Sequence, residues 1–124
     1  MIRRIYSLIN DEFPDIIVTE EMVVPRNAQA ARILTMILGA VYGYCISYRM
    51  EYEVDGKMLY SSLRPAEWRK LIDSGKKPRD REGLKNWSKQ KVAELGINLG
   101  DASNSDDVSD AILIGVAYCN KWNK

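Results

Sequence analysis

The chain has 124 residues, of which 46% are hydrophobic and 28% are charged, and its 18 basic and 17 acidic residues nearly cancel. These values are typical of a globular domain and exclude a largely disordered chain. The absence of histidine excludes Ser-His-Asp, Cys-His and histidine-ligated zinc chemistry. Two cysteines, Cys45 and Cys119, are too few for a zinc knuckle or a disulfide framework, so we expect buried thiols in a reducing cytoplasm.

No targeting or membrane segment is expected. The N-terminus has charges but no continuous apolar core or cleavage site, unlike a signal peptide. The longest apolar stretch, residues 33–46, contains Thr35, Gly39 and Gly43 and is too short to cross a bilayer. We therefore predict a cytoplasmic protein without a membrane partner.

The first half of the chain predicts a helix, a strand and a long helix. Apolar residues at helical spacing predict a helix over 2–12, which ends before Pro14. Residues 15–24 are rich in β-branched residues and predict a strand buried on both faces. Asn27 is a candidate N-cap for a long apolar helix over 28–49.

The second half predicts a turn at 54–57, a strand over 58–63 and three helices, with Pro65, Ser105 and Gly96 as helix-boundary residues. The helices are expected at 65–72, 82–95 and 105–119. In the second of these, Trp87 and Val92 are expected to face inward. Basic residues occupy the loop at 74–81, and a second loop is expected at 99–104. This order predicts an α/β fold with a small sheet flanked by helices.

Charge is unevenly distributed along the chain. Residues 64–91 contain ten basic and four acidic residues, whereas the remainder contains eight basic and thirteen acidic residues. A basic segment beside acidic residues suits a protein that holds a phosphate backbone and a cation together. The alternative is a solvated pair of helices with scattered charges.

Three carboxylates are candidate metal ligands. Glu20 falls inside an apolar strand, where an unpaired carboxylate is costly to bury; the alternative is a strand-end glutamate paired with a surface base. Asp107 and Asp110 are three residues apart on one helix face. First-turn aspartates also stabilise a helix dipole, but Asp110 lies a full turn inside the helix. Two carboxylates from a helix and one from a strand form a ligand set for Mg²⁺.

These residues resemble the RuvC family of Holliday-junction resolvases. The segment from Pro14 to Asn27, followed by a helix with Gly39, is similar to the central segment of that family. Asp107-Val-Ser-Asp110-Ala resembles its D-x-x-D-A helix. Pro65-Ala-Glu-Trp-Arg-Lys and Trp87-Ser-Lys-Gln-Lys-Val resemble intervening segments of phage-type members.

The resemblance implies a ribonuclease H-like fold, usually a homodimer, and cleavage of four-way DNA junctions with two Mg²⁺ or Mn²⁺ ions in a bacterial or phage-infected cell. By position, Glu20, Asp107 and Asp110 would be catalytic metal ligands, with Glu21 as the alternative to Glu20. The implied DNA-contacting residues are Arg26, Asn27, Lys85, Lys89 and Lys91.

The chain departs from the family at its start. Nothing before residue 15 matches the aspartate-bearing first strand, so residues 1–124 are expected to form a single partial domain without the N-terminal strands. The leading hypothesis is a divalent-metal-dependent endonuclease that cuts branched DNA in recombination or repair. The alternatives are a non-catalytic junction-binding protein, a truncated resolvase that requires a partner, and a structural dimer in which an exposed sheet edge recruits a second chain. The tyrosines Tyr42, Tyr44, Tyr48 and Tyr52 could serve that interface or could be core and surface of one helix.

Overall fold

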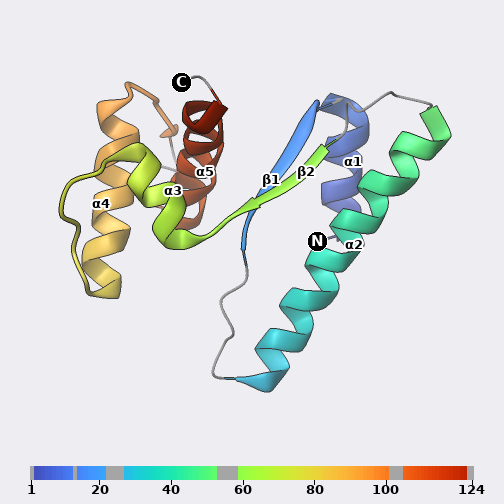
Figure 1. Cartoon of the computed structure of the whole chain (residues 1–124), viewed down its shortest axis with the longest axis horizontal. Coiled ribbons are helices and arrows are strands. Elements are labelled where there is room, and N and C mark those ends of the chain that lie inside the picture. The colour runs from blue at the N-terminus through green and yellow to red at the C-terminus, as the bar shows by residue number, and fades with distance from the viewer. Residues whose placement is uncertain (1, 13, 22–26, 53–58, 101–104, 123–124) are drawn as a thin grey trace. The chain divides into compact units, whose positions relative to one another are not determined.

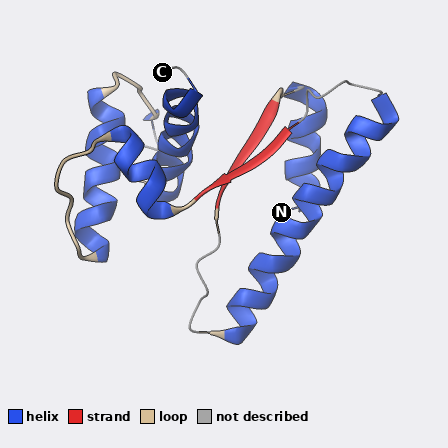
Figure 2. Cartoon of the chain, in the orientation of Figure 1, coloured by secondary structure: helices blue, strands red, loops and turns tan. Residues whose placement is uncertain are grey.

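The computed structural model describes the chain except residues 1, 13, 22–26, 53–58, 101–104 and 123–124 (Figure 1). The chain divides into two compact units, Met1–Ser62 and Leu63–Lys124. It is a mixed α/β protein, mostly helical, and the strands of the described residues form one small parallel sheet (Figure 2). The expected α/β class is therefore confirmed.

The first unit is built around a strand–helix–strand segment. Strand β1 (Ile16–Glu20) pairs with β2 (Leu59–Leu63), and helix α2 (Ala28–Tyr52) lies between them in the sequence. Parallel strands require such a crossover, which usually contains a helix. Asn27 caps α2 as expected, because its side-chain oxygen accepts hydrogen bonds from the backbone N–H groups of Gln29 and Ala30 at 2.9 and 3.4 Å.

Helix α1 (Ile2–Glu12) packs against α2 and completes the core of the first unit. Ile9 on α1 is buried with Val41 and Cys45 on α2. Tyr6 stacks on Tyr44 with ring centroids 4.1 Å apart. Apolar residues four apart on α2 share a face, which explains why Val41 and Cys45 are buried together.

The tyrosines of α2 make contacts inside the first unit. Tyr44 donates a hydrogen bond to Asn10, and the Tyr42 ring meets Tyr60 of β2 edge to face at a centroid distance of 5.2 Å. Tyr44 is half-buried, whereas Tyr42 stays exposed despite its contact with Tyr60, so the expected tyrosine interface stays a prediction. The side chains of Tyr48 and Tyr52 lie outside the described residues.

One expectation for the first unit is wrong. All five residues of β1 are half-buried, because the described sheet has only two strands and leaves β1 partly open; the expected strand was buried on both faces.

The long apolar helix starts where it was expected and ends three residues later than residue 49. Its residues 28–47 have a mean hydropathy of 1.4, are 11% buried, and are long and apolar enough to cross a membrane. Mostly buried core helices of soluble proteins and signal sequences near an N-terminus share this length and composition.

The expected strand continued to Val24 and the expected turn occupied residues 54–57; residues 22–26 and 53–58 lie outside the described part. The same holds for residues 101–104 of the expected second loop.

The second unit contains three helices with clear sequence boundaries. Helix α3 (Pro65–Ile72) begins with proline, and α4 (Arg81–Glu94) begins after Asp80, whose side chain accepts a hydrogen bond from the Gly83 N–H at 3.0 Å. Helix α4 ends before Gly96, which has a left-handed φ of 74° that glycine adopts without steric cost. Helix α5 (Asp106–Trp122) begins after Ser105, whose hydroxyl accepts a hydrogen bond from the Val108 N–H at 3.2 Å.

Helix α5 packs against both α3 and α4. Its buried apolar residues, Leu113, Ile114 and Ala117, follow helical spacing. Trp68 of α3 and Trp87 of α4 are also buried, with ring centroids 6.3 Å apart. The expected inward position of Trp87 is therefore confirmed.

The two cysteines differ in burial. Cys45 is buried, and burial raises the pKa of its thiol. Cys119 is exposed, so the expectation of two buried thiols is wrong for this residue. It follows Ala117 by two positions, which is about 200° around the helix and away from the buried face of α5.

We expect Leu113→Ala to destabilise the second unit by about 2–5 kcal/mol, because it removes a fully buried side chain and leaves a cavity. All three tryptophans belong to this unit, so tryptophan fluorescence during urea unfolding measures the effect. The control Val108→Ala changes an exposed residue of the same helix. An equal loss of stability in both variants would contradict this packing.

Candidate functional site

The second unit contains a cleft of about 370 Å³ lined by charged side chains. Four basic residues, three aspartates and Leu84 line it: Arg69, Arg79, Arg81, Lys85, Asp106, Asp107 and Asp110 are the charged members. Arg69 comes from α3, Arg81 and Lys85 from α4, and the aspartates from the first turns of α5. The structure thus brings Lys85, Asp107 and Asp110, three of the residues implied by the resemblance, to one cleft.

Helix α5 places Asp107 and Asp110 by its own packing. Ser105 caps the helix, and Ser109, between the two aspartates, is fully buried and donates a hydrogen bond to the Ser105 carbonyl at 3.0 Å. With Ser109 turned inward, Asp107 is exposed and Asp110 is half-buried at the cleft. Their spacing of three residues keeps both carboxylates on neighbouring positions of one face.

An ion pair crosses the cleft beside these two carboxylates. Lys85 Nζ lies 3.4 Å from an Asp106 carboxylate oxygen. A hydrogen bond from its own backbone N–H and one from Lys85 lower the pKa of Asp106. The charge of Asp106 is thus partly neutralised, whereas Asp107 and Asp110 form no ion pair with another described residue.

Arg69 forms part of the cleft wall. Its guanidinium carbon lies 4.9 Å from the centroid of the Trp68 ring, a cation–π contact. Its Nε is buried and has no hydrogen-bond partner within the described residues. Arg69 thus combines a fixed position over an indole ring with an unused donor.

The remaining residues implied by the resemblance lie elsewhere. Glu20 is the half-buried last residue of β1 in the first unit. Asn27 caps α2 in the same unit, and Arg26 lies outside the described residues. In neither unit do three carboxylate or thiol side chains of the described residues gather as a metal-binding group.

Lys89 and Lys91 lie on α4 but do not line the cleft. Lys91 Nζ lies 2.9 Å from Asp73 and 3.2 Å from Glu94, and these two carboxylates raise the pKa of Lys91. It also lies 6.0 Å from the centroid of the buried Trp87 ring. Lys91 therefore ties the end of α3 to the end of α4.

Sequence reasoning did not single out Arg69, Arg79 or Arg81 as site residues. Arg69 was visible only as part of the Trp68-Arg69 segment, and Arg79 and Arg81 only as part of a basic loop. Their place beside Asp107 and Asp110 depends on how α3, α4 and α5 pack together, which no local pattern reveals.

Comparisons of the chain with models of protein families, with curated proteins and with solved structures gave no match. The resemblance to the resolvases therefore rests on the motifs in the sequence.

The carboxylates of the second unit predict its acid sensitivity. The backbone N–H of Gly75 and the ammonium of Lys91 lower the pKa of Asp73, and Lys121 lowers that of Glu67. Such groups stabilise the fold above their unfolded pKa of about 4, and this stability is lost as the pH falls through their lower folded values.

We therefore expect the second unit to unfold at progressively lower temperature between about pH 5 and pH 2, and Asp73→Asn to reduce that decrease. Thermal unfolding followed by tryptophan fluorescence measures it. Asp11→Asn, in α1 of the first unit, is the control. If Asp73→Asn shows the same pH dependence as the parent chain, the Asp73 contacts contribute nothing to acid sensitivity.

Proposed function

We propose that this chain is a divalent-metal-dependent endonuclease that cleaves branched DNA, of the Holliday-junction resolvase type. The observation that carries the proposal is the cleft of the second unit. There, Asp107 and Asp110, the residues of the D-x-x-D-A motif, share one hollow with Arg69, Arg79, Arg81 and Lys85. Basic side chains attract a phosphodiester, and carboxylates attract the cation that activates it.

The donor set fits Mg²⁺ or Mn²⁺ bound together with a phosphate. Mg²⁺ is commonly held by one or two carboxylates plus substrate phosphates and water, rather than by a cage of protein ligands alone. Asp107 and Asp110 provide two such carboxylates, and Asp106, the third in the cleft, is paired with Lys85. The resemblance also implies Glu20 of the first unit as a ligand, and the parallel strand–helix–strand segment that carries Glu20 is consistent with a ribonuclease H-like fold.

The roles of the chain's own residues follow from their charge and position. Asp107 and Asp110 bind the metal, and Arg69, Arg79 and Arg81 hold the phosphate group against it. Lys85 keeps Asp106 ionised and limits repulsion between adjacent aspartates. Two divalent ions, when bound, supply activation of water and stabilisation of the leaving oxygen. This division of work needs no histidine, in agreement with the composition.

A second function, junction binding without cleavage, is favoured by one observation. The described residues of neither unit present a group of three metal-binding side chains, while basic side chains outnumber aspartates in the cleft. A protein that retained only the phosphate-binding part would bind branched DNA and leave it intact. Its binding would weaken as salt concentration rises.

We expect Asp107→Asn and Asp110→Asn each to reduce cleavage of a labelled four-way junction in Mn²⁺ by at least about 100-fold, the upper end of the effect of losing an outer-shell partner of a metal ligand. DNA binding should remain, because neither variant removes a cation. Gel assays of cleavage and of binding on the same preparations measure both effects.

Glu82→Gln is the matched control, because it removes one exposed carboxylate from the first turn of α4. Cleavage at the parent rate is expected for it. A parent chain that binds the junction but leaves it uncut in both Mg²⁺ and Mn²⁺ supports the binding function instead. Glu20→Gln then tests the first unit: unchanged cleavage would remove Glu20 from the site.

Metal and DNA should also bind cooperatively, since a DNA phosphate would add an oxygen ligand to those that Asp107 and Asp110 offer the metal. We expect Mn²⁺ to bind more tightly when a non-cleavable junction is present, and the junction to bind more tightly by the same factor when Mn²⁺ is present. Calorimetric titrations in both orders measure the two factors. In Asp107→Asn/Asp110→Asn, we expect neither effect; cooperativity that survives in this variant would place the metal elsewhere.

A further inference from the structure

The loop that joins α3 to α4 carries a concentration of positive charge. Residues 74–81, here called the basic loop, comprise this loop and Arg81, the first residue of α4. They contain four basic residues and one acidic residue. The basic residues are Lys76, Lys77, Arg79 and Arg81. The acidic residue, Asp80, is occupied as the N-cap of α4.

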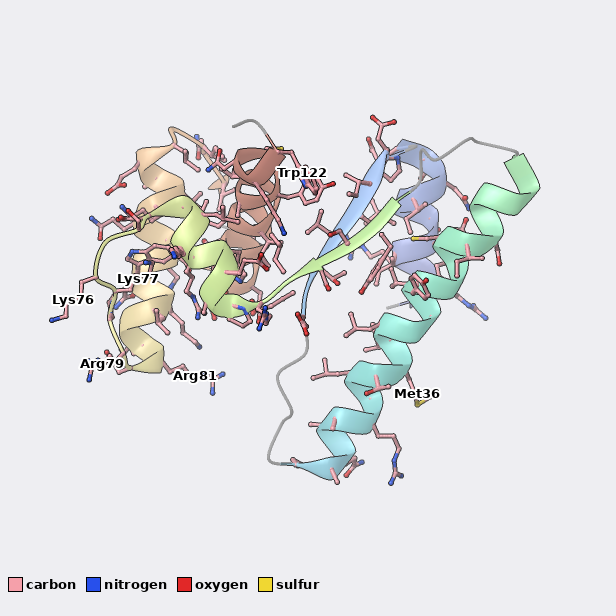
Figure 3. All side chains as sticks on the ribbon, viewed as in Figure 1. Met36, Lys76, Lys77, Arg79, Arg81 and Trp122 are labelled. Atoms are coloured by element: carbon pink, nitrogen blue, oxygen red, sulfur yellow. The ribbon has the colours of Figure 1, made fainter. Side chains whose placement is uncertain are left out.

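The four cations of the basic loop differ from the ion-paired lysines of the second unit. Lys85, Lys91 and Lys121 each form an ion pair with a carboxylate. None of the four loop cations forms an ion pair with another described residue. Lys76, Arg79 and Arg81 are exposed, and Figure 3 shows their side chains directed outward. Concentrated charge that the protein does not neutralise is available to an external anion.

The loop is held at both ends along α4. Asp73, just before it, binds Lys91 near the end of α4 at 2.9 Å, and Asp80 caps the beginning of that helix. The basic loop therefore runs antiparallel to α4 (Figure 1). Within it, the Gly75 N–H donates to Asp73 at 2.8 Å, and Lys77 Nζ donates to the Gly75 carbonyl at 2.8 Å. These contacts limit the conformational freedom that a flexible loop would lose on binding.

The length of the basic loop suits binding along a nucleic-acid duplex. The loop follows α4 from its N-cap Asp80 to Lys91, which is 11 residues of helix or about 16 Å. The same length of duplex axis carries about five phosphates on each strand. The C-terminal end of the basic loop reaches the cleft, because Arg79 and Arg81 line the cleft together with Asp107 and Asp110.

We propose that the basic loop binds the phosphate backbone of a duplex arm and guides it into the cleft of Asp107 and Asp110. The contacts are with phosphates, so they position the duplex and carry no base preference. The inference rests on the proposed function for the nature of the ligand. It adds Lys76 and Lys77 to the phosphate-binding residues of the proposed function, and neither residue is among those implied by the family resemblance.

The test is the salt dependence of duplex binding in EDTA, where cleavage cannot occur. Lys76→Gln/Lys77→Gln/Arg79→Gln removes three cations from the loop. Arg3→Gln/Arg4→Gln/Arg32→Gln removes three exposed cations from the first unit and is the matched control. Fluorescence anisotropy of a labelled 20-base-pair duplex at several salt concentrations gives the slope of log affinity against log salt.

We expect the loop variant to bind more weakly and its slope to be shallower by about 2.7, since each lost phosphate contact changes the slope by about 0.9. The control should retain the parent slope. A parent slope in the loop variant overturns the inference, as does an equal change in both variants. A parent chain that binds no duplex overturns this inference, whereas the endonuclease is decided by cleavage of the four-way junction.

A different result separates the two proposals. Suppose that the salt slope of the loop variant is shallower than the parent slope, while the parent chain does not cut a junction in Mg²⁺ or Mn²⁺. The loop inference is then supported and the endonuclease is contradicted.

Discussion

The packing of α5 against α3 and α4 is the constraint on which the second unit depends. Leu113 and Ala117 are fully buried and lie four residues apart, so together they fix the rotation of α5 about its axis. Ser109, one turn earlier, is buried on the same side. This rotation presents Asp107 and Asp110 to the cleft that Arg69 and Lys85 also line. The apolar core and the charged site are thus two consequences of one helix orientation.

The charges of the cleft explain how three aspartates can crowd into five residues of one helix. The positive N-terminal end of α5 stabilises carboxylates in its first turn, and Lys85 pairs with Asp106. Asp110 lies further from the helix start and gains less from the helix dipole. The arginines of the cleft oppose the remaining negative charge. The cleft therefore holds both signs of charge side by side.

Local chemistry made most of the secondary structure predictable. The helices lie close to their expected ranges because Asn27, Pro65, Ser105 and Gly96 act at their own boundaries through hydrogen bonds or backbone angles. Burial was harder to predict, since it depends on neighbours distant in sequence. The openness of β1 follows from the small number of strands, and the exposure of Cys119 follows from which face of α5 is covered. Helix α2 lies close to its expected range of 28–49, because Thr35, Gly39 and Gly43 interrupt the apolar run without ending the helix.

The candidate site shows the same division between local and distant information. The spacing of Asp107 and Asp110 is local, and their common face was predictable. The total charge of residues 64–91 could also be predicted from the sequence. Which of its cations are paired with carboxylates could not. Lys91 lies in that basic segment, yet Asp73 and Glu94 neutralise it from distant and nearby positions. Lys76 and Arg79 have no such ion-pair partner among the described residues. A count of basic residues therefore does not show which cations of residues 64–91 are paired with carboxylates of the chain. The ion pairs of the described structure make that distinction.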